Sequence, residues 1–195
     1  MPDVGAIILA AGGSRRFGRP KQLLAFQSES LVRRSVRVAT EAGIVSLAVI
    51  AGESVDAIKG EVRETSAAVV ENRDWQLGLG TSIRSGLRHL RASSPSLEAV
   101  VIIACDQPFV EASTIAALLE ERKRSGKQIV ASSYAGTLGI PALFDRSCFE
   151  ALFALADDSG AKALIESRQD EVAQIKFEQG AIDIDTPADL ERLAN

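Results

Sequence analysis

The chain has 195 residues, of which 46% are hydrophobic and 25% charged, a composition that suits one folded domain with a full core. Its formal net charge of −4 argues against a general nucleic-acid or membrane-surface binder. No apolar stretch approaches the roughly 18 residues of a membrane span, and the chain has only two cysteines, so we expect a cytoplasmic protein with reduced thiols.

Short apolar runs that predict buried strands alternate with amphipathic stretches that predict helices. The predicted strands are residues 4–10, 44–52, 67–72, 98–106, 128–134 and 171–177. The predicted helices are residues 30–43, 54–64, 81–93, 111–126, 146–156, 160–168 and 186–195. This alternation predicts an α/β fold: a three-layer α/β/α sandwich with a mostly parallel, Rossmann-like sheet, in a single domain over residues 1–195.

The first predicted strand leads into the basic, glycine-containing stretch LAAGGSRRFGRPKQLL, residues 9–24. The small residues Ala10, Ala11, Gly12 and Gly13 allow backbone N–H groups to approach an anion closely. Positive charge comes from Arg15, Arg16, Arg19 and Lys21. Because ligands of such sheets bind at the carboxyl ends of the strands, the stretch predicts a phosphate-binding loop, although it matches neither the Walker A nor the dinucleotide fingerprint. The alternative is a solvated basic loop.

Carboxylates follow two other predicted strands. Asp106 ends the apolar run VVIIACD, where a hard cation such as Mg²⁺ would be held together with substrate phosphates. The alternative is a turn before Pro108. The stretch DIDTPADL offers Asp183 or Asp185 as a second metal ligand, although an Asp and a Thr before a Pro are also an ordinary helix start.

The stretch ENRDWQLGLGTSIRSG, residues 71–86, combines polar side chains with closely spaced glycines. Asn72 and Ser82 are suited to hydrogen-bonding a base or a ribose. Trp75 is expected to be a core residue. The sequence shows no Cys/His cluster for zinc and no nucleophile paired with a base.

Six motifs in the same order resemble those of the molybdenum cofactor cytidylyltransferases. Residues 9–24 resemble the nucleotidyltransferase signature, with LAAG where the related guanylyltransferases read LAGG. The later matches are NRDWQLGLGTSIRSG, CDQPFV, GIPALF, DDSGAKALI and DIDTPADL. Cys105 stands where the family has a glycine before the metal-binding Asp. The resemblance runs from Gly5 to Leu190.

This resemblance implies Mg²⁺-dependent transfer of CMP from CTP to the phosphate of molybdopterin, with release of pyrophosphate. It implies that residues 9–13 (Leu9, Ala10, Ala11, Gly12, Gly13) hold the nucleotide, with Asn72 and Ser82 near the base or ribose. Arg15 and Lys21 would bind the triphosphate, and Lys21 is the first choice for an essential side chain. Asp106 would bind the metal, with Asp185 as its partner.

Other functions remain open at this stage. The protein could instead be a molybdopterin guanylyltransferase, or another enzyme that joins a nucleotide to a phosphorylated acceptor. These enzymes would catalyse the same type of reaction on different substrates. A carrier would bind molybdenum cofactor and deliver it to a client molybdoenzyme with little transfer activity. The acceptor, the oligomeric state and the role of Cys105 cannot be read from the sequence.

Overall fold

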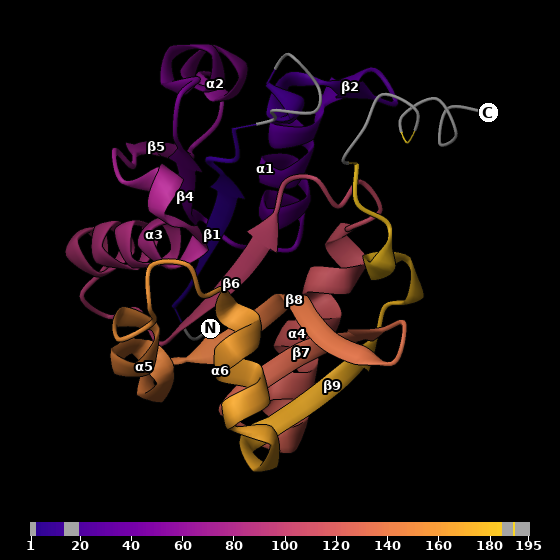
Figure 1. The fold of residues 1–195 in the computed structure, drawn as a ribbon. Coiled ribbons are helices and arrows are strands. Elements are labelled where there is room, and N and C mark those ends of the chain that lie inside the picture. The colour runs from indigo at the N-terminus through magenta and orange to yellow at the C-terminus, as the bar shows by residue number, and fades with distance from the viewer. Residues whose placement is uncertain (1–2, 14–19, 185–188, 190–195) are drawn as a thin grey trace.

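The computed structural model describes residues 3–13, 20–184 and 189. Within them, seven strands form one sheet in the order β5-β4-β1-β6-β8-β7-β9 (Figure 1). In chain order these are β1 (Val4–Ala10), β4 (Ser46–Ala51), β5 (Ala68–Glu71), β6 (Ala99–Ala104), β7 (Ile129–Tyr134), β8 (Thr137–Asp145) and β9 (Val172–Lys176). Strands β2 (Ala25–Phe26) and β3 (Glu29–Ser30) form a separate small hairpin.

Helices cover both faces of the sheet, as Figure 1 shows, so the predicted three-layer sandwich is confirmed. One face is covered by α1 (Leu31–Glu41), α2 (Val55–Val62) and α4 (Ala112–Ser125). The other is covered by α3 (Leu79–Ser93), α5 (Phe149–Phe153) and α6 (Ala161–Ser167). No helix in the described ranges has the length and apolar character needed to cross a bilayer.

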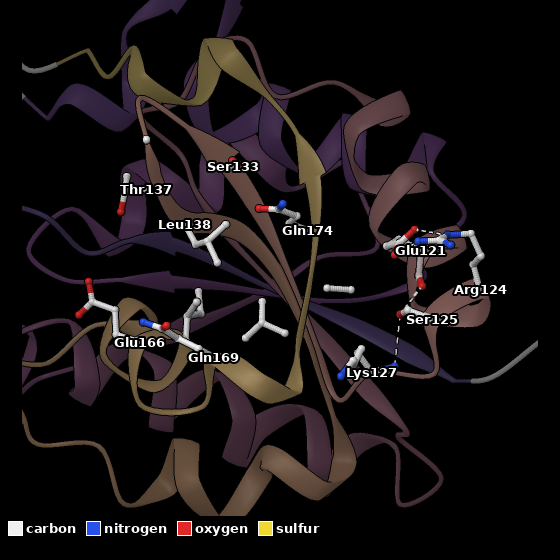
Figure 2. Close-up of a pocket in the computed structure, with 14 residues that line it drawn as sticks. Glu121, Arg124, Ser125, Lys127, Ser133, Thr137, Leu138, Glu166, Gln169 and Gln174 are labelled. Atoms are coloured by element: carbon white, nitrogen blue, oxygen red, sulfur yellow. Dashed lines mark hydrogen bonds and ion pairs between the residues drawn. The ribbon is translucent and has the colours of Figure 1, made fainter.

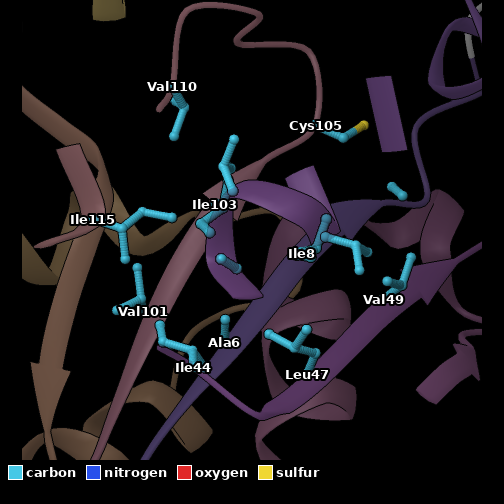
Figure 3. Packing of buried hydrophobic residues seen from close by; sticks show 14 of the residues in the cluster. Ala6, Ile8, Ile44, Leu47, Val49, Val101, Ile103, Cys105, Val110 and Ile115 are labelled. Carbon is cyan, nitrogen blue, oxygen red and sulfur yellow. The ribbon is translucent and has the colours of Figure 1, made fainter. Parts of the chain in front are cut away.

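The alternation of side chains along β1 ties the sheet to both helical layers. Ala6 and Ile8 belong to the core under α1, α2 and α4, which Figure 3 shows from close by. Ile7 and Leu9 point into the core under α3. Strand β1 pairs with β4 on one side and β6 on the other, and both of its faces are buried. The first residues of the loop that follows β1 are therefore held in a fixed position.

One strand was missed by the sequence patterns. Residues 137–145 form β8, which runs antiparallel to both β6 and β7, whereas the other sheet pairings are parallel. Pro141 lies inside this strand, and a proline there argues against a strand prediction. The sheet tolerates it because the β7–β8 register shifts between Ala131 and Ser132. The prediction of a mostly parallel sheet is confirmed.

The remaining differences are at element boundaries. Helix α3 begins at Leu79, one half-turn before the predicted start at Thr81. The predicted helix over residues 146–156 is a short turn, Arg146–Cys148, followed by α5. The predicted terminal helix over residues 186–195 lies, except for Asp189, outside the described residues.

Candidate active site

A pocket of about 610 Å³ opens where the neighbouring parallel strands β1 and β6 end. This is the edge of the sheet at which the sequence predicts a ligand site. Of the predicted site residues, the pocket is lined by Leu9, Ala11, Gly12, Gly13, Lys21, Ser82 and Asp106. Ala10 and Asn72 do not line it, and Arg15 and Asp185 lie outside the described residues.

The loop after β1 is held in shape by a buried glutamine. Gln22 donates two hydrogen bonds from Nε2, to the carbonyl oxygens of Ala10 at 2.8 Å and Gly12 at 2.6 Å. It lies on the short turn Lys21–Leu23 (η1) that follows the loop, and its side chain is 3% exposed. Satisfying these carbonyl oxygens internally leaves the loop's N–H groups as its anion-binding atoms.

Trp75, which lines the pocket, packs against the backbone of two glycines. A Cβ atom on Gly13 would lie 2.7 Å from Trp75 Cη2, and one on Gly52 would lie 2.7 Å from Trp75 Cγ. The prediction that Trp75 is a core residue is wrong, because the indole is only half-buried and lines this pocket. The close approach explains why these two positions require glycine.

A short ion pair joins the loop side of the pocket to the end of β6. Lys21 Nζ lies 2.5 Å from Asp106 Oδ2, and both side chains are partly exposed, at 16% and 22%. The two residues are 85 positions apart in the chain. The fold therefore brings the predicted triphosphate-binding lysine and the predicted metal-binding carboxylate into direct contact.

The segment that ends at Ile184 is attached to the backbone of Asp106, at the end of β6. Ile184 donates its backbone N–H to the carbonyl oxygen of Asp106 at 2.9 Å. Its side chain is fully buried in a small cluster with Leu24, Phe26 and Leu31. This attachment puts Asp183 into the pocket lining beside Asp106.

The donor set fits a magnesium ion that is shared with substrate phosphates. Asp106 and Asp183 offer hard carboxylate oxygens in one pocket, and Mg²⁺ commonly takes one or two carboxylates together with phosphate oxygens. The described residues contain no cluster of three or more His, Cys, Asp or Glu side chains that could hold a metal by themselves. The arrangement therefore suits a metal that arrives with a nucleotide better than a permanently bound structural ion.

Cys105 lines the pocket, but its thiol is neutral. Burial, and then the nearby Asp106 carboxylate, raise the pKa of this thiol far above its usual range. Because the thiolate is the form that attacks and that binds metals, Cys105 contributes shape rather than chemistry. It is a free cysteine, as the sequence predicts.

The Asn72 side chain forms hydrogen bonds within the protein rather than facing the pocket. Its Nδ2 donates to Thr81 Oγ1 at 2.8 Å and to Ser82 Oγ at 3.0 Å, and its Oδ1 accepts from the backbone N–H of Asp74 at 3.1 Å. The side chain is 4% exposed. Asn72 thus ties the end of β5 to the first turn of α3 and orients Ser82 at the pocket wall.

Replacing Asn72 with alanine is expected to lower the free energy of unfolding by about 2–3 kcal/mol, because three buried hydrogen bonds lose their partner. Urea denaturation followed by circular dichroism measures the loss. Gln76→Ala, an exposed change on the segment that follows Asn72, is the control and should change stability by less than about 0.5 kcal/mol. Equal stability of the two variants would contradict this role for Asn72.

Three residues that line the pocket were not predicted as site residues from the sequence. Gln22 follows Lys21 and could have been a surface side chain, because only the folded loop shows which carbonyl oxygens it meets. Tyr134 and Gln107 also line the pocket. Gln107 lies in a recognised motif, but its partners come from β8 and the C-terminal segment, which are distant in the chain.

A second cavity, of about 780 Å³, lies along strand β9 at the far edge of the sheet (Figure 2). It is lined by the end of α4, the β7–β8 hairpin and α6, and it contains none of the predicted site residues. Charged groups on its α4 side have partners in the protein: Arg124 pairs with Glu121, and Lys127 Nζ donates to the carbonyl oxygen of Asp170. It offers no counterpart of the Lys21–Asp106 arrangement.

The fold is that of an α/β nucleotidyltransferase, with a mostly parallel sheet and a basic, glycine-containing stretch of sequence after the first strand. Residues 6–172 match the MobA-like NTP transferase domain, so the chain belongs to this family. Membership identifies it as an enzyme that uses nucleoside triphosphates.

Two curated proteins are similar in sequence to this chain, one over nearly all of it and one over more than half. The purine catabolism protein PucB of Bacillus subtilis is 28% identical over 97% of this chain and 95% of its own length. A probable molybdenum cofactor guanylyltransferase of Bacillus cytotoxicus is 32% identical over 59% of this chain and 55% of its own length.

Solved structures agree with the fold. The Rv0371c homolog from Mycobacterium sp. strain JC1 is 32% identical, with a TM-score of 0.80 over 98% of this chain and 95% of that one. A manganese complex of Rv0371c from Mycobacterium tuberculosis is 27% identical, with a TM-score of 0.77 over 98% of this chain and 97% of that one.

Proposed function

We propose that the protein transfers CMP from CTP to the terminal phosphate of molybdopterin and releases pyrophosphate, with Mg²⁺ as the metal. The observation that carries the proposal is the Lys21–Asp106 pair, at 2.5 Å, in a pocket at the ends of β1 and β6. A cation for phosphates and a carboxylate for a metal are the two groups that nucleotidyl transfer requires.

The chain's residues would divide the work as follows. Backbone N–H groups of residues 9–13 hold the nucleotide, and Lys21 together with Arg15 neutralises the triphosphate and the departing pyrophosphate. Asp106, with Asp185 as its partner, holds the metal, which supplies further charge neutralisation at the phosphates. An oxygen of the acceptor phosphate attacks the α-phosphorus, so the protein's task is to position the two substrates and stabilise charge.

Nucleotide choice is proposed from the shape of the loop. Ala11 lines the pocket and is 8% exposed, and we propose that its methyl group narrows the space that the base of the nucleotide would occupy. The smaller pyrimidine ring of CTP suits this space better than guanine. Similarity to the probable molybdenum cofactor guanylyltransferase of Bacillus cytotoxicus supports the alternative, a molybdopterin guanylyltransferase. The manganese complex of Rv0371c supports a divalent metal in this fold.

Thermal shifts with CTP, GTP, ATP and UTP, each with and without Mg²⁺, test the nucleotide. We expect CTP with Mg²⁺ to raise the melting temperature most, because a ligand that binds only the folded state stabilises it by about 2.7 kcal/mol at one hundred times its Kd. Without Mg²⁺ the shift should be small. A Lys21→Ala variant, which lacks the cation proposed to bind the triphosphate, should show a weaker CTP shift.

The outcomes separate the candidate functions. A larger shift with GTP would replace cytidylyl by guanylyl transfer and leave the site assignment intact. No shift with any nucleotide would contradict nucleotidyl transfer and favour a carrier of molybdenum cofactor. If transfer is found, the client molybdoenzyme becomes the partner to identify.

A further inference from the structure

Strand β9 forms an outer edge of the sheet. It is the last strand in the sheet order, and among the described strands it pairs with β7 alone (Figure 1). The backbone N–H of Phe177, directly after β9, donates to the carbonyl oxygen of Ser133 in β7 at 3.0 Å. Because the direction of the backbone groups alternates along a strand, Val172, Gln174 and Lys176 turn their N–H and C=O groups away from the sheet.

Strand β9 lacks the features with which proteins commonly block an open edge. Its sequence, VAQIK, contains no proline and has a single charged side chain, at its last residue. Its pairing with β7 is continuous from Val172 to Lys176, without a bulge. These outward N–H and C=O groups are therefore free of the usual obstacles to pairing with another strand.

The opposite edge strand, β5, is less suited to pairing. The backbone N–H of Asn72 donates to Ala51 in β4 at 2.8 Å, so by the same alternation only Val69 and Glu71 of β5 turn their backbone groups outwards. Glu71 is exposed and charged, and a charge on an edge strand opposes pairing.

The cavity of about 780 Å³ beside β9 provides space for a further strand (Figure 2). Helix α4 packs over β7, β8 and β9 on one face of the sheet, whereas α6 packs over β8 on the other face. The side of β9 that faces α6 is therefore incompletely covered. Val172, Ala173 and Gln174 line the cavity from β9.

The charges along this cavity are balanced. Glu121 and Glu166 supply two negative side chains, and Arg124 and Lys127 supply two positive ones. Such a surface is complementary to a second copy of itself, whereas a strongly charged partner gains no net attraction from it. A two-fold axis beside β9 reverses the direction of α4, so Arg124 of one copy is directed toward Glu121 of the partner subunit.

A two-fold axis at Gln174 is the symmetric arrangement that pairs all five residues of β9. In an antiparallel ladder, residues that face outwards lie opposite residues that face outwards. Gln174 then lies opposite Gln174 of the partner subunit, and the two amides can each donate and accept. Ala173 lies opposite Ile175 of the partner subunit, a small side chain against a large one. Val172 lies against the methylene stem of Lys176 of the partner subunit.

We propose that the protein is a two-fold symmetric dimer in which the β9 strands of two copies pair antiparallel and join the two sheets into one. Both copies use the same strand, so the contact is closed at two chains, as is usual for symmetric dimers. The active-site pocket is lined by no residue of β9. The dimer is therefore independent of the proposed substrates, and its test needs none of them.

The test is sedimentation equilibrium of the full chain over a wide range of concentrations. We expect wild type to have twice the mass of one chain. Gln174→Pro removes an N–H that the β7 pairing does not use, so this variant should keep its far-ultraviolet circular dichroism and sediment as a monomer. Gln174→Thr, which keeps the N–H and suits a strand, is the matched control and should remain a dimer.

A pair of charge variants tests the register without altering the backbone. Gln174→Lys and Gln174→Glu each put two like charges opposite one another at the axis, which destabilises the pairing. Because Gln174 is exposed in one chain, both variants should fold. Each alone is expected to sediment as a monomer at concentrations where wild type is a dimer, and an equimolar mixture of the two should form dimers again.

Three results would overturn the proposal. Wild type that stays monomeric at every concentration would show that β9 does not pair with a second copy. Dimers that persist in Gln174→Pro and in both charge variants would place the interface elsewhere. Monomeric charge variants whose mixture also stays monomeric would show that Gln174 does not lie at the axis.

Discussion

Replacing Lys21 with alanine is expected to slow nucleotidyl transfer by about 10²–10³-fold, the usual effect of removing one preorganised charge from a transition state. Lys21 is 16% exposed and lies against Asp106 in the pocket, so its charge acts in a partly desolvated place. The measurement is steady-state pyrophosphate release. Lys123→Ala, which removes a lysine paired with Glu120 on the exposed side of α4, should leave the rate unchanged.

The Lys21→Ala variant is expected to bind a divalent metal more tightly than wild type when no nucleotide is present. In the nucleotide-free protein the Lys21 ammonium neutralises the Asp106 carboxylate, and a cation at this distance opposes a second one. Removing it is therefore expected to raise the affinity for free Mn²⁺, followed by electron paramagnetic resonance, while nucleotide binding falls. If both affinities fall together, the lysine holds the site's structure rather than its charge balance.

Replacing Asp106 with asparagine is expected to lower transfer by at least about 10³-fold, because the amide keeps the shape of the carboxylate but is a poor magnesium ligand. The Mg²⁺-dependent part of the CTP thermal shift should disappear. Folding should be preserved, since the backbone oxygen of Asp106 still accepts from Ile184. Asp56→Asn, on the exposed surface of α2, is the control.

This variant also separates transfer from delivery. If Asp106→Asn loses transfer and still activates a client molybdoenzyme supplied with finished cofactor, the protein has both roles. A variant that transfers at the wild-type rate would show that the metal-binding assignment of Asp106 is wrong.

The layers of the fold could be predicted from the sequence because buried parallel strands are continuous apolar runs. Residues 4–10 and 98–106 show this pattern clearly. Strand β8 could not be predicted in this way, because Gly139 and Pro141 interrupt it and only the pairing with β6 and β7 stabilises it. An antiparallel strand inside the sheet that contains a glycine and a proline is therefore harder to predict from the sequence than a continuous apolar run.

The candidate site was partly predictable for a related reason. Glycines and charges at strand ends pointed to Gly12, Lys21 and Asp106, which the structure brings into one pocket. The place of Asn72 was not predictable, because a polar residue near glycines looks the same whether it faces a ligand or, as here, ties β5 to α3. Arg15 and Asp185 remain predictions from the sequence.

The most direct test of the central claim is a transfer assay with α-labelled CTP, molybdopterin and Mg²⁺, in which pyrophosphate and labelled product are counted together. The account predicts one pyrophosphate for each nucleotide joined to the acceptor, dependence on the acceptor, and loss of both products in Asp106→Asn. Pyrophosphate release that does not need the acceptor, or no labelled product with any of the four nucleotides, would contradict it.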